Sequence, residues 1–255
     1  MSGWLGLIDV IVVVGVAVVL PMALGGPATR WRFAGAGVAV ALAAPTGWGS
    51  AVFVLPFVVV ALAAVTGPRG DLATIYALVA ATGLFVSRLR FDPFGFGEPI
   101  GELAGVHFVY AGAAALSFAR GMRVTQVITA TAPPIVAIGF FSGAAVPQIG
   151  GAVLMTIAVW SIGARHARVA LDRAERASAR LFLGVSAVCI TAPMVLAMSW
   201  AAGEHFPVPA LSIPDMVRAH GIANAFGFTL CGLIGRRLST TCPMVRSAAT
   251  MARIS

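Results

Sequence analysis

Glu102-Leu-Ala-Gly-Val-His107-Phe-Val-Tyr110-Ala-Gly112 is one of the two most informative stretches of this sequence, because it sets a carboxylate, an imidazole and a phenol in an otherwise apolar run. Asp215-Met-Val-Arg-Ala-His220-Gly-Ile-Ala-Asn224 repeats the pattern near the end of the chain. Each stretch has a carboxylate near the start of a hydrophobic segment and a histidine further in. Ionisable groups at membrane depth cost free energy unless they face protein or water. We therefore expect the functional residues to lie in these two segments.

The composition predicts a membrane protein. The chain has 255 residues, of which 59% are hydrophobic and only 10% are charged, and its mean hydropathy is +0.96. A soluble domain carries about 25% charged residues. A surface this poor in charge requires lipid as its main solvent, so the sequence indicates a polytopic protein in a lipid bilayer.

Apolar runs bounded by Pro, Gly and Arg predict an all-α transmembrane helix bundle in a single domain, residues 1–255. About nine spans are expected, with eight as the alternative, because the second span is short and could form a re-entrant pair with the third. The predicted spans are 6–24, 31–45, 50–66, 72–87, 99–118, 123–142, 147–164, 180–201 and 215–235.

The net charge of +8 comes from 17 basic residues, all of them arginines that lie mostly between the apolar runs. This distribution argues against a nucleic-acid-binding face, which would cluster basic and aromatic residues together. With nine spans, most arginines fall on one side, Arg88 and Arg90 excepted, and the positive-inside rule then predicts a cytoplasmic C-terminus. His166 and the arginines of the 165–180 run are expected to meet water and anionic lipid headgroups.

Cys189, Cys231 and Cys242 are widely spaced and include no CxxC pair, so neither a disulfide framework nor a thiolate metal site is expected. Tryptophans near the predicted span ends are typical of an interfacial aromatic belt. They are Trp4, Trp31, Trp48, Trp160 and Trp200.

The fifth and ninth predicted spans run in the same direction, so their polar residues fall at similar depth. We expect them to line one cavity if the two helices pack together. The side chains concerned are Glu98, Glu102, His107, Tyr110, Asp215, His220 and Asn224. Asp215 and Arg218 are close enough in sequence to pair, and His220 and Asn224 share a face one turn apart.

Two interpretations of the histidines stay open at this point. They could form interhelical hydrogen bonds that only brace the bundle, or they could react with or bind a ligand. A haem between two histidines, or a zinc ion held with Glu102 or Asp215, can be imagined, but nothing in the spacing is specific for either. No metal and no cofactor is therefore predicted.

These segments resemble the YndJ-like family of bacterial membrane proteins. The similar region runs from about Glu98 to Arg237 and includes Leu103-Ala-Gly-Val-His-Phe-Val-Tyr-Ala-Gly112, Ala132-Pro-Pro-Ile-Val-Ala-Ile-Gly139 and Met216-Val-Arg-Ala-His-Gly-Ile-Ala-Asn-Ala-Phe-Gly-Phe228. The resemblance implies a multi-pass protein of the bacterial inner membrane. Val109 stands where the family pattern has a second histidine, which argues against metal binding by a histidine pair. The family name assigns no activity.

The overall plan is more distantly similar to small membrane-integral terpene cyclases of bacteria. That similarity implies acid-initiated ring closure on a lipophilic prenylated or terpenoid substrate, with Glu102 or Asp215 as proton donor. His107, Tyr110, His220 and Asn224 would orient the acid or take the final proton, while Glu98, Phe108, Phe226 and Phe228 would surround the substrate. Aromatic faces can stabilise carbocations, and a carboxylic acid in an apolar pocket stays protonated. The alternatives are a carrier or sensor that binds a proton, ion or solute, and a non-catalytic structural protein.

Overall fold

Nine helical rods make up the described part of the chain, which contains no strand. The computed structural model describes residues 3–25, 27–42, 49–67, 70–91, 95, 97 and 99–240. Glu98, Cys242, Trp48 and the arginines after residue 240 lie outside this part. The all-helical expectation is confirmed.

The rods are numbered here in chain order, and four of them are built from several consecutive helices. Rod 1 is α1 (Gly3–Val14), η1 (Gly15–Val19) and α2 (Leu20–Leu24); rod 2 is α3 (Pro27–Leu42); rod 3 is α4 (Gly49–Thr66); rod 4 is α5 (Leu72–Arg88); rod 5 is α6 (Ile100–His107), η2 (Phe108–Ala114) and α7 (Ala115–Ala119). Rod 6 is α8 (Arg123–Ser142); rod 7 is α9 (Ala145–Leu171); rod 8 is α10 (Ala177–Cys189) and α11 (Thr191–Gly203); rod 9 is α12 (Ile213–Met216), η3 (Val217–Gly221), η4 (Ala223–Leu230) and α13 (Cys231–Leu238).

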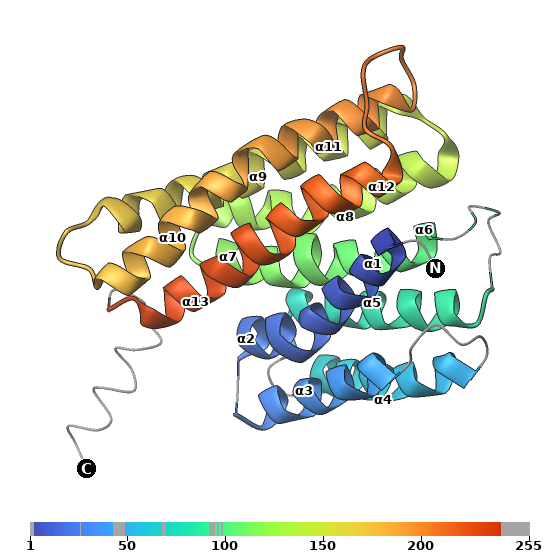
Figure 1. Ribbon diagram of the computed structural model, residues 1–255, viewed down its shortest axis with the longest axis horizontal. Coiled ribbons are helices and arrows are strands. Elements are labelled where there is room, and N and C mark those ends of the chain that lie inside the picture. Colours follow the sequence, from blue (N-terminus) through green and yellow to red (C-terminus); the bar gives the residue numbers. More distant parts are fainter. Residues whose placement is uncertain are drawn as a thin grey trace.

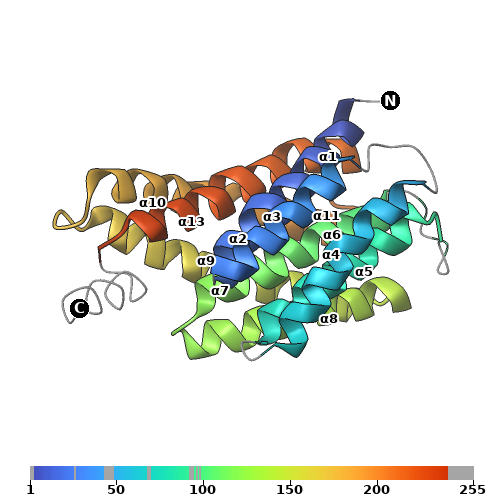
Figure 2. The same cartoon turned by 90° about the horizontal axis from the view of Figure 1, so that it is seen from below.

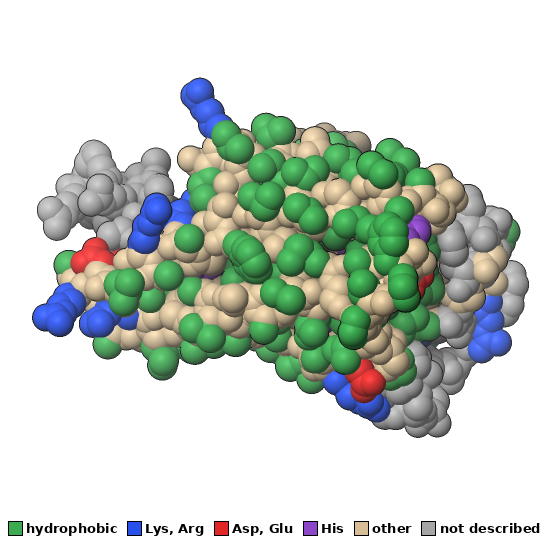
Figure 3. All heavy atoms as spheres, turned by 90° about the horizontal axis from the view of Figure 1, so that it is seen from above, with side chains coloured by type: hydrophobic (Ala, Val, Ile, Leu, Met, Phe, Trp, Pro, Cys, Tyr) green, Lys and Arg blue, Asp and Glu red, His purple; other side chains and the backbone are tan. Residues whose placement is uncertain are grey.

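Five rods are long and apolar enough to cross a bilayer. They are Gly6–Leu24, Ile100–Ala119, Arg123–Ser142, Ala145–Leu171 and Ala177–Gly203. Two shorter apolar helices, Ala51–Thr66 and Leu72–Arg88, add to them. The flank of the molecule carries many hydrophobic side chains, whereas charged side chains gather toward its two ends (Figure 3). This distribution fits a bundle that presents its flank to lipid.

Rods 1, 5 and 9 lie side by side at the centre of the bundle (Figures 1 and 2). Rods 2, 3 and 4 pack on one side of them, and rods 6, 7 and 8 on the other. The apolar stretch of rod 5 is 61% buried inside the protein, whereas that of rod 6 is only 22% buried. Rod 5 is therefore central and rod 6 peripheral. The core side chains of rod 1, such as Val16 and Leu20, have no exposed surface.

The three central rods run parallel. At one end Arg88 of rod 4 contacts both Asp9 of rod 1 and Glu102 of rod 5. At the other end Arg236 and Arg237 of rod 9 reach the last turns of rods 5 and 1. We call these the Glu102 end and the Arg236 end. The shared direction of rods 5 and 9 is the one expected from the sequence.

Small residues let neighbouring rods approach closely, as is common in membrane bundles. A Cβ atom on Gly37 of rod 2 would lie 2.5 Å from the Cα atom of Ala17 in rod 1. A Cβ atom on Gly35, in the same helix, would meet nothing within 4 Å. The two glycines thus offer a matched pair for testing the packing of rods 1 and 2.

We predict that Gly37→Ala destabilises the protein by roughly 2 kcal/mol, because the new methyl group meets backbone that cannot move aside. Gly35→Ala should be neutral or slightly stabilising, since alanine is the better helix former. Thermal unfolding in one detergent or nanodisc preparation measures both. Equal stability of the two variants would contradict this packing.

Candidate functional site

Two imidazoles meet where rods 5 and 9 touch near the Glu102 end. The ring centroids of His107 and His220 are 6.3 Å apart and their planes differ by 26°. Each histidine lies seven residues after the start of its rod, at Ile100 and Ile213, which places both rings about 10 Å along the helix axis. The expected convergence of these histidines at equal depth is confirmed.

Both rings are hydrogen-bonded through Nδ1 to a backbone carbonyl oxygen. His107 Nδ1 lies 2.7 Å from the carbonyl oxygen of Leu103, and His220 Nδ1 lies 2.8 Å from that of Pro193. Because a carbonyl oxygen can only accept, each Nδ1 carries the hydrogen and each Nε2 is free of it in the neutral ring. Both Nε2 atoms are therefore available to take a proton.

The two Nε2 atoms differ in their surroundings. His220 Nε2 lies 3.0 Å from the side-chain nitrogen of Asn224, which donates to it. His107 has an exposed ring, and its Nε2 has no partner among the described residues. The amide oxygen of Asn224 is buried and also without a partner in that part of the chain. The Nε2 atom of His107 is therefore free to accept a proton, whereas the Nε2 atom of His220 already accepts a hydrogen bond from the Asn224 amide.

Wide helical turns surround the imidazoles. His107 is the last residue before η2, His220 lies in η3 and Asn224 lies in η4, and all three segments are π-helical. Rod 1 has its own π-helical segment, η1, and it packs on η2 and η4. Such turns are rare and frequently mark functional sites. Nothing in the residue pattern distinguished them from ordinary α-turns.

Glu102 lies in an ion-paired group. Its carboxylate accepts a hydrogen bond from Arg88, whose guanidinium also lies 2.5 Å from Asp9. The Glu102 and Arg88 side chains are only 14% and 16% exposed, so water screens them little. A guanidinium partner favours the ionised carboxylate. Glu102 therefore does not lie in the apolar pocket that would keep it protonated. The ion pairs with Asp9 and Glu102 also explain why Arg88 lies on the side of the bundle that has few arginines.

Asp215 lies at the surface, at the start of rod 9. It accepts hydrogen bonds from the hydroxyl group of Ser212 at 2.7 Å and from Arg218 at 3.0 Å, and its side chain is 53% exposed. The expected pairing with Arg218 is confirmed. Asp215 thus belongs to the first turn of the helix, where negative charge is favourable, and not to a cavity with the imidazoles.

The aromatic side chains do not gather around the imidazole pair, which corrects the expectation of one cavity. Phe108 stacks on Tyr76 of rod 4, with ring centroids 5.6 Å apart. The Tyr110 hydroxyl donates to the carbonyl oxygen of Ile11 in rod 1 at 2.9 Å. These neighbours diverge because successive helical residues point in different directions.

Rod 9 shows the same dispersion. Phe228 is buried against Phe118 of rod 5, and its ring centroid lies 6.1 Å from that of His166. Phe226 packs, partly buried, against the general hydrophobic core. Of the residues predicted to form the site, His107, His220 and Asn224 come together, and Glu98 lies outside the described residues.

His166 is buried, with only 2% of its surface exposed, so the expectation that it meets water and lipid headgroups is wrong. Its Nδ1 lies 2.9 Å from the Ser186 hydroxyl, which in turn donates to the carbonyl oxygen of Phe228. Rod 7 continues to Leu171, beyond the predicted end at 164, and carries His166 on its buried face. The spacing of Val159, Ile162 and His166 is the signal that could have shown this.

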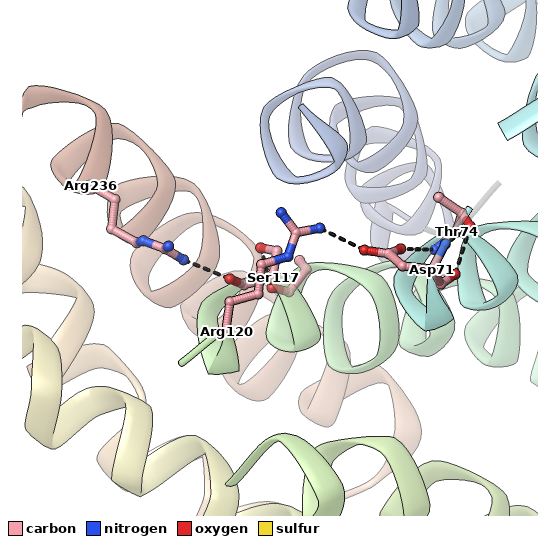
Figure 4. Close-up of polar contacts among 6 residues, drawn as sticks. Asp71, Thr74, Ser117, Arg120 and Arg236 are labelled. Atoms are coloured by element: carbon pink, nitrogen blue, oxygen red, sulfur yellow. Dashed lines mark hydrogen bonds and ion pairs between the residues drawn. The ribbon is translucent and has the colours of Figure 1, made fainter. Parts of the chain in front are cut away.

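Arginines cap the central rods at the Arg236 end. Arg236 donates to the carbonyl oxygen of Ser117 at 2.9 Å (Figure 4). Arg165 donates to the carbonyl oxygens of Phe118 and Arg120. Cations at a helix C-terminus satisfy its last carbonyl groups and complement its dipole. Nearby, Arg120 pairs with Asp71, the N-cap residue of rod 4.

The sequence matches the YndJ-like protein family over residues 10–228. The chain belongs to the YndJ-like family. The match begins well before Glu98 and ends before Arg237, and it includes most of rod 1 and all of rods 2, 3 and 4 of this YndJ-like chain. No curated protein and no protein of solved structure matches it.

Within the described residues of the YndJ-like chain, no group of three or more His, Cys, Asp or Glu side chains is arranged to hold a metal ion. Cys189 and Cys231 are free and partly buried, and Cys242 lies outside those residues. A Cβ atom on Gly227 would lie 2.6 Å from Cys189, so this thiol fills the contact between rods 8 and 9.

Glu102 and Asp215 should respond differently to amide substitution in this YndJ-like protein. Glu102→Gln should destabilise it by about 2 kcal/mol, because Arg88 loses a partner in a poorly hydrated place. Asp215→Asn should leave the unfolding temperature nearly unchanged, because its ion pair is exposed. Thermal unfolding measures both, and a more harmful Asp215→Asn would contradict the assigned contacts.

Proposed function

We propose that this protein is a proton sensor of the membrane, with His107 and His220 as its proton-binding pair. The proposal belongs to the carrier-or-sensor class that the sequence left open. The observation that carries it is the stacking of the two rings, with centroids 6.3 Å apart. The Nε2 atom of His107 has no described partner, whereas that of His220 accepts a hydrogen bond from Asn224. Histidine is the side chain suited to take up protons near neutral pH.

A purely bracing role accounts for His220 but not for His107. His220 connects rods 9 and 8 through its bond to Pro193. His107 bonds only to Leu103, four residues earlier in its own helix, and so connects no rods by hydrogen bonding. Its open Nε2 instead supports a role that depends on gaining a proton.

Asn224 offers a way for His220 to hold a proton. In the neutral ring the amide nitrogen of Asn224 donates to Nε2. If Nε2 is protonated, rotation of the amide turns its oxygen toward the ring, where it accepts the new hydrogen. The amide oxygen has no other described partner to lose. Proton uptake by His220 would thus rotate the amide group of Asn224 in rod 9.

The two protonation steps should depend on one another. Two unit charges 6.3 Å apart repel by roughly 3 kcal/mol at an effective dielectric constant of about 20. Glu102 and Asp215 are already paired with arginines, so neither is available to neutralise a second imidazolium. The pair is therefore suited to hold one proton readily and two only with difficulty.

Charge near the Arg236 end favours a sensor over a proton carrier. His166, the only other deep imidazole of the described chain, is buried, and burial opposes a positive charge there. The nearby guanidinium groups of Arg236 and Arg165 oppose it further. Fixed arginines exclude protons in the same way in membrane pores. A proton that reaches the imidazole pair from the Glu102 end thus meets a barrier before it can cross.

We further propose that the Arg236 end faces the cytoplasm of a bacterial inner membrane. Most described arginines lie at that end, while Arg88, Arg90 and Arg218 lie at the other. This asymmetry follows the positive-inside rule. The chain would then cross the membrane with its nine rods, and the imidazole pair would lie in the outer half.

Acid-initiated cyclisation of a prenylated substrate stays a prediction. It needs a neutral carboxylic acid, and the two candidate acids are each held by an arginine. Loss of ring-closure activity in Glu102→Gln or Asp215→Asn, with the fold retained, would favour it over the sensor. That activity would be measured by product analysis in membranes supplied with linear prenylated substrates.

Histidine-selective ¹⁵N NMR in nanodiscs tests the sensor directly, since the chain has 4 histidines. Between about pH 5 and 8 we expect the pair to take up a single proton at an Nε2 atom, while each Nδ1 keeps its own hydrogen. His107→Gln should let His220 accept a proton more readily, because the neighbouring charge is gone. His205→Gln is the matched control, because His205 bonds to Gln148 in a different place.

Two results would contradict the sensor. One is a pair whose signals stay constant over this pH range or titrate independently of each other. The other is a proton flux into liposomes, driven by a membrane potential, that His220→Gln abolishes, because this would make the protein a carrier.

A reporter fused after Ile254 tests the orientation separately. We expect cytoplasmic reporter activity, since the arginine-rich connections cannot readily cross the membrane. Periplasmic activity would invert the bundle and place the imidazole pair in the inner half.

A further inference from the structure

Two arginines at the Arg236 end belong to rods 2 and 9, which both pack on rod 1. Arg30 belongs to the first turn of rod 2 and Arg237 to the last turn of rod 9. Partial burial, and after it the positive charge of Arg30, lowers the pKa of Arg237 below its ordinary value. Arginine stays protonated in proteins, so the two charges must be accommodated as they are.

No acidic side chain of the described residues is paired with either arginine. Neither arginine forms an ion pair in the described part of the chain, and the sequence after residue 240 contains no Asp or Glu. Arg237 has one described hydrogen bond, to the carbonyl oxygen of Met22 at 3.3 Å. Arg30 has none, and its Nε atom is buried without a partner. A buried, unpartnered donor of positive charge is unfavourable unless an anion joins it.

The surroundings of the two arginines match the headgroup level of a membrane. Trp31, the next residue after Arg30, is 80% exposed, and exposed tryptophans mark the boundary between lipid tails and water. The first turn of rod 2 also presents backbone N–H groups that lack partners within the helix. Both features favour a phosphate group whose lipid tails lie along the apolar flank.

We propose that Arg30 and Arg237 bind the phosphate group of an anionic membrane lipid between rods 1, 2 and 9. A guanidinium group matches a phosphate with two parallel hydrogen bonds, and the Nε of Arg30 is available for one of them. The bound phosphate would offset the repulsion between the arginines and hold rod 2 against the central rods. This site is separate from the imidazole pair, so it does not depend on the proposed proton sensing.

Thermal unfolding with added lipid tests the site. The purified protein is compared in phosphatidylglycerol, in phosphatidylcholine and in detergent with inorganic phosphate. We expect phosphatidylglycerol alone to stabilise the parent. Arg30→Gln should weaken phosphatidylglycerol binding about fivefold, the effect of one basic residue near an anionic headgroup. Arg173→Gln, an exposed arginine at the same end, is the matched control and should behave as the parent.

Arg30→Gln should also raise the unfolding temperature without lipid, by about 3 °C, because it removes the repulsion and the buried Nε. If Arg30 only stabilised the fold, Arg30→Gln would instead lower the unfolding temperature without lipid. Equal loss of stability with and without phosphatidylglycerol, or equal lipid responses of Arg30→Gln and Arg173→Gln, would overturn the proposal. If inorganic phosphate stabilised the parent as much as phosphatidylglycerol does, and if this effect were lost in Arg30→Gln, the site would bind free phosphate and not a lipid.

Discussion

Hydrogen bonds and ion pairs from a few arginines join the ends of the three parallel central rods. In a lipid environment a charged or hydrogen-bonding group must find its partner within the protein. Arg88 joins rods 1 and 5 through Asp9 and Glu102 at one end. Arg236 and Arg237 join rod 9 to rods 5 and 1 at the other. Rods 1, 5 and 9 are thereby held parallel and in fixed register.

That register brings His107 and His220 to the same depth. Close contact of the central rods is possible because small residues line it: a Cβ atom on Gly15 of rod 1 would lie 3.0 Å from Val109. The π-helical turns of the same rods widen the helices around the pair. The site is thus a product of helix contact and not of a cavity lined by acids, which is why a proton sensor fits it better than an acid catalyst.

The sequence predicted the helices well because apolar length and Pro, Gly and Arg boundaries are local signals. It also placed His107 and His220 together, since equal direction and equal depth follow from counting spans. Partners of charged groups could not be predicted: Glu102 was expected in an apolar pocket, but a distant arginine, Arg88, reaches it. Such contacts depend on which rods pack side by side, and the residue pattern of a single rod does not contain that information.

His166 was misplaced for a related reason. Its arginine neighbours suggested a solvated connection, whereas rod 7 continues through them and turns only the histidine inward. The π-helical turns were not foreseen either, because they arise from packing and leave no residue signature. Membership of the YndJ-like family identifies the type of protein but carries no information on these contacts.

A double-mutant cycle on pH-dependent stability tests whether His107 and His220 hold protons as one pair. The change in unfolding free energy between about pH 8 and pH 5 is measured for the parent, His107→Gln, His220→Gln and the double variant. We expect the two single effects to be non-additive, with a coupling of about 1 kcal/mol or more, and the same cycle with His107 and His205 to show no coupling. Additive effects in the first cycle would contradict this expectation.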